Sequence, residues 1–104
     1  GKAAESKTHP IAMQLIGHLT TPSNVAMRQE AIAELEQAID ELKAIDREVV
    51  TLRHFELLDN KEVAEVLEIS EKAASIRYIR AIKRLKERMQ MLEEPHEGDY
   101  EKRS

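Results

Sequence analysis

Cysteine is absent from this sequence of 104 residues, and glycine, proline and aromatic residues are represented by only three each. Without cysteine, neither disulfide bonds nor thiolate-bound metals are available. No apolar run approaches the roughly 20 residues that a membrane helix needs, and the amino terminus lacks the pattern of a signal peptide. A core with so few aromatic rings must consist of Leu, Ile, Val, Ala and Met, which suits helices. These absences predict a soluble cytoplasmic protein without membrane attachment.

The length and the composition fit one small globular domain. Apolar residues make up 41% of the chain and charged residues 35%, a balance typical of globular proteins rather than disordered chains. A large enzyme is excluded at this length. Because the chain begins with Gly1 rather than Met, we expect it to be a fragment of a longer protein.

The charge is unevenly distributed along the chain, although the net charge is only −4. Residues 1–70 carry seven Lys and Arg against 13 Asp and Glu, which gives −6. Residues 71–90 carry seven Lys and Arg against two Glu, which gives +5, and residues 91–104 are again acidic. A basic stretch is most often a solvated helix face, so its position in the fold decides whether it binds nucleic acid.

The apolar spacing predicts an all-α domain of four helices over residues 22–92, preceded by a flexible linker over residues 1–21. Residues 11–19 contain at most a short amphipathic turn, because a glycine and the Thr-Thr-Pro-Ser segment interrupt the pattern. Thr21 can cap the first helix, with Pro22 at its first position. The apolar stripe of this helix has the spacing of a single helical face: Val25, Ile32, Leu35, Ile39 and Leu42.

Two shorter helices are expected next. The first spans residues 45–57, with Asp46 in the first turn, where a negative charge is favourable. Its apolar stripe includes Val49 and Leu52, which are predicted to be core, and Phe55, which is predicted to be a packing residue. The second begins at Asp59 and ends near Leu67, because Asp59 and Glu62 fit a capping box.

A long basic helix is the last predicted element. Ser70 can cap it, and no Gly or Pro interrupts the chain from Glu71 to about Leu92. An acidic tail over residues 93–104 is predicted to be disordered. The inward face of the long helix should carry Ala74, Tyr78, Ala81, Leu85 and Met89.

The last two helices have the arrangement of a helix-turn-helix motif without a wing. This motif needs a short bracing helix, a tight turn, here at residues 68–70, and a third helix that enters the major groove. On that helix, Lys, Arg and Ser can contact base edges, and an apolar side chain can contact a thymine methyl group. The outward face is predicted to carry Lys72, Ser75, Ile76, Ile79 and Arg80. Phosphate contacts are expected from residues at the flanks or further along, which are Arg77, Lys83 and Arg84.

Three sequence motifs in this order and spacing resemble a known family. They are I-D-R-E-V-V with L-R-H-F-E over residues 45–56, E-V-A-E-V-L over residues 62–67, and the basic run over residues 69–85. In combination they resemble region 4, the carboxy-terminal DNA-binding domain, of extracytoplasmic-function sigma factors in the sigma-70 family. The resemblance covers about residues 23–92.

The resemblance implies two partners. One is promoter DNA, with the last helix reading the minus-35 element through the outward residues named above. The other is RNA polymerase core, with the first two helices docking on the flap of its beta subunit. The docking candidates are Ile39, Leu42, Ile45 and Leu52. An anti-sigma factor is a further possible partner in such a family.

The chain departs from the family pattern at several positions. Many members have Gly where Glu68 stands, a turn position that often needs a positive φ and where Glu would be strained. Thr and a basic residue are common at the positions of Ala73 and Ser75, so the promoter preference cannot be copied from a relative. The region that reads the minus-10 element is missing, which again implies a carboxy-terminal fragment whose residues 1–20 correspond to the linker.

Catalysis, metal binding and cofactor binding are not predicted. The four histidines lie far apart and lack metal-ligand spacing, so we expect surface histidines. There is no nucleophile and base pair and no Gly-rich phosphate loop. Two alternatives to the sigma interpretation stay open: the output domain of a response regulator, and a helical adaptor that docks on proteins without binding DNA. A salt titration separates DNA binding from the adaptor, because neutralised phosphates release counterions.

Overall fold

The structure, a computed structural model, describes residues 7–20 and 22–93, and every regular element in them is a helix. The predicted all-α class is therefore confirmed. The helices are α1 (Thr8–Leu19), α2 (Val25–Glu41), α3 (Ala44–His54), α4 (Asn60–Leu67) and α5 (Glu71–Glu93). The predicted tail lies outside the described residues from residue 94 onward.

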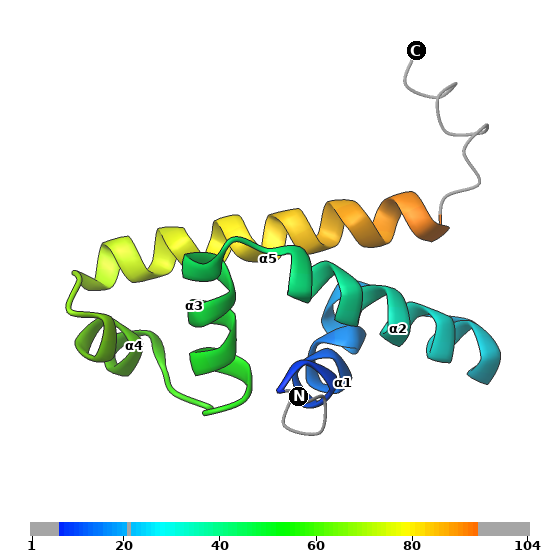
Figure 1. Cartoon of the computed structure of the whole chain (residues 1–104), viewed down its shortest axis with the longest axis horizontal. Coiled ribbons are helices and arrows are strands. Elements are labelled where there is room, and N and C mark those ends of the chain that lie inside the picture. The colour runs from blue at the N-terminus through cyan, green and yellow to red at the C-terminus, as the bar shows by residue number, and fades with distance from the viewer. Residues whose placement is uncertain (1–6, 21, 94–104) are drawn as a thin grey trace, which may run out of the picture.

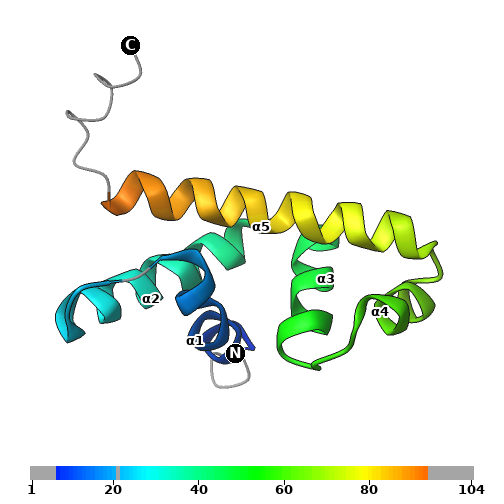
Figure 2. The ribbon, with the colours of Figure 1, turned by 180° about the vertical axis from the view of Figure 1, so that it is seen from behind.

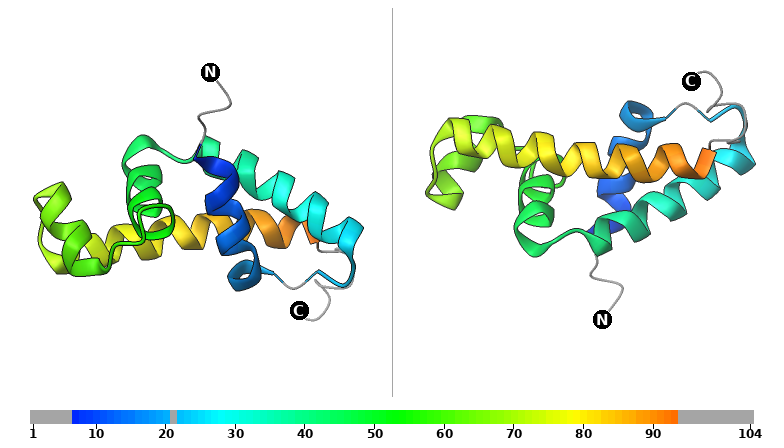
Figure 3. Two further views of the ribbon diagram at one scale, coloured as in Figure 1. Left: turned by 90° about the horizontal axis from the view of Figure 1, so that it is seen from below. Right: turned by 90° about the horizontal axis from the view of Figure 1, so that it is seen from above.

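Helix α5 runs the length of the molecule, and the other four helices pack against one side of it (Figures 1 and 2). Helices α3 and α4 lie at its amino-terminal half, and α2 lies at its carboxy-terminal half with α1 beneath (Figure 1). Seen from above, the opposite side of α5 is not covered by any other helix of the described chain (Figure 3). The basic helix thus has one packed face and one open face.

The expectation of a short turn within a flexible linker was wrong for residues 8–19, which form α1. Ile11, Leu15 and Ile16 of this helix are each only 1% exposed, and Ala12 is fully buried. Tertiary packing supplies most of the stability of short helices, so burial of this stripe outweighs the glycine at position 17. The domain has five helices in its described part instead of four.

The start of α2 also differs from the prediction. Its N-cap is Asn24, whose side-chain oxygen accepts a hydrogen bond from the Met27 N–H at 2.8 Å. The predicted cap, Thr21, lies outside the described residues. Val25, the first residue of α2, was predicted to be core. Its side chain lies on the solvent side of the helix and is 72% exposed, so this prediction was wrong.

A single core joins all five helices. Most of the predicted core residues are in it, including Ile32, Leu35 and Val63, whereas Leu52 and Leu67 pack at its edge. Phe55, predicted to be a packing residue, is 39% exposed at the end of α3 and does not belong to this core.

Candidate nucleic-acid interface

The turn between α4 and α5 fixes where α5 starts. Glu68 adopts the left-handed conformation with φ 61°, as the turn position was expected to require. This conformation lets the Ile69 N–H donate to the Ala64 carbonyl at 3.0 Å, a bond typical of a helix end with a left-handed residue. The Ala73 N–H donates to the Ser70 hydroxyl at 3.0 Å, which confirms the predicted N-cap of α5.

Helix α4 is braced at its own start and against α5. The Glu62 N–H donates to Asp59 Oδ1 and the Asp59 N–H donates to Glu62 Oε1, each at 2.9 Å, so the predicted capping box is confirmed. The Asn60 side-chain amide donates to the Glu71 carbonyl oxygen at 2.9 Å. These bonds fix the first turns of both helices relative to each other, which is what a helix-turn-helix needs to present its last helix.

The inner face of α5 packs as predicted. Ala74 and Ala81 are fully buried, Leu85 and Met89 are each 1% exposed, and Tyr78 is half-buried. The small alanine side chains leave room for the neighbouring helices to approach α5.

We call four exposed side chains on the open face of α5 the outer ridge: Lys72, Ile76, Ile79 and Lys83. Their spacing of four, three and four places them on one face of the helix. Ile76 is 53% exposed and Ile79 is 61% exposed, and both lysines are exposed. Ser75, also predicted to face outward, is half-buried beside the ridge.

The arginines of α5 follow one flank of the helix, next to the outer ridge. Arg77, Arg80, Arg84 and Arg88 are three, four and four residues apart, and so share that flank. Arg80 Nη2 donates to Oδ1 of Asp46 at 3.0 Å, although Asp46 is only 1% exposed. Arg77 is half-buried, and Arg84 lines a groove between α2 and α5. Asp46 lies in the first turn of α3, as predicted, and is also the buried partner of a predicted DNA contact.

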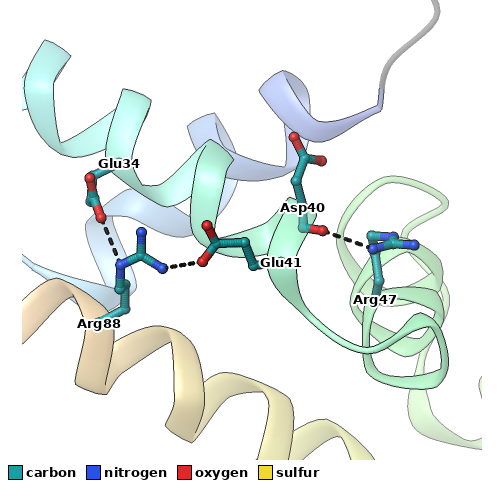
Figure 4. A network of polar contacts seen from close by, with 5 residues as sticks. All are labelled: Glu34, Asp40, Glu41, Arg47 and Arg88. Atoms are coloured by element: carbon teal, nitrogen blue, oxygen red, sulfur yellow. Dashed lines mark hydrogen bonds and ion pairs between the residues drawn. The ribbon is translucent and has the colours of Figure 1, made fainter.

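A second arginine cluster ties α5 and α3 to α2 (Figure 4). Arg88 donates through Nε to Glu34 at 2.7 Å and through Nη1 to Glu41 at 2.6 Å. The hydrogen bond that Arg88 donates to Glu41 raises the pKa of Arg88. Arg47 Nη1 donates to the Asp40 carbonyl oxygen at 3.1 Å, near the end of α2. These contacts could not be predicted from the sequence, because partners as far as 54 positions apart leave no local pattern.

A hydrogen-bonded chain joins α1, α3 and α5. Because the Gln14 side-chain oxygen only accepts, His54 Nδ1 donates to it, at 2.5 Å, and Nε2 accepts from the Tyr78 hydroxyl at 2.6 Å. Burial, together with the positive charge of Arg53 and the nearby His18, lowers the pKa of His54 to about 4. The imidazole is therefore neutral near pH 7, as this pattern requires. The prediction of a surface histidine was wrong for His54, whereas His96 lies outside the described residues.

The four docking candidates do not form one exposed surface. Ile39 is fully buried and Leu42 is 8% exposed, because Ile39 in α2 and Leu42 directly after α2 both pack into the core. Ile45 is 43% exposed, and Leu52 is half-buried. These last two line a shallow groove along α3 that reaches Lys7 before α1.

Metal-ligating side chains do not cluster in the described residues: no three His, Asp or Glu lie close enough to hold an ion. Within the same part of the chain, the helices are too short or too polar to cross a membrane.

The short braced helix, the tight turn and the long helix with an open face define a helix-turn-helix domain. The family described as sigma-70, region 4 matches residues 32–85, and the chain belongs to this family. It is a family of transcription-factor domains that bind DNA and RNA polymerase, and not an enzyme family. Neither the curated proteins nor the solved structures include a significant match to the chain.

Proposed function

We propose that this chain recognises the minus-35 promoter element through α5, as region 4 of an extracytoplasmic-function sigma factor. The main support for the proposal is the outer ridge, because it lies on the open face of α5. The turn after α4 fixes the position of this helix. Seven of the 16 Lys and Arg of the chain lie in residues 71–90, which concentrates positive charge on the same helix. Such a helix attracts phosphates while its outward side chains reach base edges.

Docking on the RNA polymerase beta flap belongs to the same proposal. Of the candidates named from the sequence, Ile45 and Leu52 support it best, because they line the groove along α3. Ile39 and Leu42 support docking only indirectly, by packing α2 against α5. A cytoplasmic location and an anti-sigma factor as a further partner belong to the same proposal.

Membership of the sigma-70 region 4 family favours this function over a response-regulator output domain. The adaptor alternative predicts no dependence on phosphate contacts. DNA binding by the chain should weaken steeply with salt, since each neutralised phosphate releases counterions.

The test is a fluorescence-anisotropy titration of this chain with duplex DNA that it selects from a randomised pool, at a series of salt concentrations. Lys83→Ala should lower the slope of log K against log salt by about one, because one phosphate contact is lost. Arg28→Ala is the matched control, since it removes one exposed positive charge from α2. Its slope should equal that of the unchanged chain.

Binding that does not vary with salt, or no measurable binding, would favour the protein-docking adaptor. An equal loss of slope in both variants would move the interface away from α5.

A further inference from the structure

The centre of the outer ridge is apolar, although the helix around it is basic. Ile76 and Ile79 lie three residues apart on the same face and are more than half exposed. Neither belongs to the core of the described chain or packs at its edge. Two branched apolar side chains held in water on a positively charged helix therefore lack a packing role.

Two of the four arginines of α5, the side chains best suited to read guanine, are held away from this centre by acidic partners. A guanidinium can bond both acceptors of a guanine edge, but Arg80 already donates to the buried Asp46. Arg88, further along the same flank, is occupied by Glu34 and Glu41. The acidic groups of α2 and α3 thus hold these arginines at the side of α5 that faces those helices.

Lysines bracket the apolar centre. Lys72 lies four residues before Ile76, and Lys83 lies four residues after Ile79. Long cationic side chains at the two ends of the ridge suit phosphates on either side of a groove. The partner that this surface fits is therefore a duplex whose groove floor offers an apolar group at its centre. In the major groove, the only such group on a base edge is the C5-methyl group of thymine.

We infer that Ile76 and Ile79 are specificity-determining residues that contact thymine methyl groups, so the preferred site has A·T pairs under the middle of α5. The inference rests on the proposed function and adds the base chemistry to it. Burial of one methyl group corresponds to about a fourfold change in affinity.

The experiment replaces thymine by deoxyuridine, which removes the methyl group and keeps every hydrogen-bonding group of the base. Duplexes that the full chain selects from a randomised pool are synthesised with deoxyuridine at one A·T pair at a time and titrated by anisotropy. At one or two central positions, the unchanged chain should bind the deoxyuridine duplex about fourfold more weakly.

Ile76→Ala and Ile79→Ala should each abolish the discrimination at one of these positions. Both substitutions are at exposed helix sites where Ala is a good helix former, so the fold should persist. Val25→Ala is the control, because Val25 is 72% exposed at the start of α2, at the opposite end of the molecule from the start of α5 (Figure 1). It should leave the discrimination unchanged.

Equal binding of thymine and deoxyuridine duplexes, with the Lys83 dependence intact, would overturn this inference and leave the proposed function standing. Discrimination that survives both isoleucine substitutions would also overturn it. If the chain bound no duplex at all, the inference would fall together with the proposed function.

Discussion

The Asp46–Arg80 pair is an ion pair with one buried and one half-exposed member. Asp46 is 1% exposed, whereas the Arg80 side chain is 46% exposed. A carboxylate removed from water is costly unless a cation or hydrogen-bond donors compensate it. Asp46 therefore depends on Arg80 more than Arg80 depends on Asp46, and Arg80 has a structural task besides any contact with DNA.

This asymmetry predicts that loss of Arg80 destabilises the domain and that a second substitution, at Asp46, restores part of the stability. Arg80→Ala should lower the free energy of unfolding by about 3 kcal/mol, at the lower end of the range for breaking buried pairs, because Arg80 is partly solvated. Adding Asp46→Asn to Arg80→Ala should restore part of the loss, since an unpaired amide costs less than an unpaired carboxylate. Urea unfolding of Asp46→Asn, Arg80→Ala and the double variant measures this. If Arg80→Ala changed stability by less than about 0.5 kcal/mol, the pair would have no structural role.

At the scale of the elements, α4 is set between two residues in the left-handed conformation. Leu57, in the loop before α4, has φ 62° and Glu68, after α4, has φ 61°. The left-handed conformation destabilises a residue with a Cβ atom by about 1–2 kcal/mol, whereas it does not destabilise glycine. At these two residues the chain changes direction, once before and once after α4, which has eight residues.

Replacing Glu68 by glycine should therefore stabilise the domain. Relief of the strain outweighs the extra freedom of glycine in the unfolded chain, which costs about 0.4–1 kcal/mol, so Glu68→Gly should gain about 0.5–1 kcal/mol. Glu65→Gly, within α4, is the control and should lose about 1 kcal/mol. Thermal unfolding of both variants measures the difference. A loss of stability in Glu68→Gly would show that the Glu68 side chain makes compensating contacts.

The sequence predicted those element ends that depend on local hydrogen bonds. The capping box of Asp59 and Glu62 and the Ser70 cap involve residues three apart, so their pattern can be read directly. The start of α2 was wrong because Thr21 and Asn24 are both suitable caps, and only packing chooses between them. Helix α1 was underestimated for the same reason, because its stability comes from the residues that cover it.

At the scale of the whole molecule, contacts between distant residues decide which charges are free to bind DNA. Helical spacing was enough to predict that Lys72, Ile76 and Ile79 face outward. It could not show that Arg80 is paired with Asp46, 34 positions away. It also could not show the hydrogen bonds that join Gln14, His54 and Tyr78. These bonds connect α1 to α3 and α5.

The part of the chain before α5 and α5 itself also differ in charge. Residues 1–70 carry a net −6 and residues 71–90 a net +5. The acidic body should repel the phosphate backbone except where α5 faces it, which restricts the orientation of a bound duplex. We therefore expect DNA to contact this domain on the open face of α5.

The most direct test of this claim is a map of backbone amide chemical-shift changes in the ¹⁵N-labelled chain as a selected duplex is added at fixed salt. The largest changes should fall in the first half of α5, around Ser75, Ile76 and Ile79, and at the turn that precedes it. The amides of the first half of α2, from Val25 to Glu34, should change little. Changes concentrated on α2 or along the groove of α3, with α5 unaffected, would contradict the account.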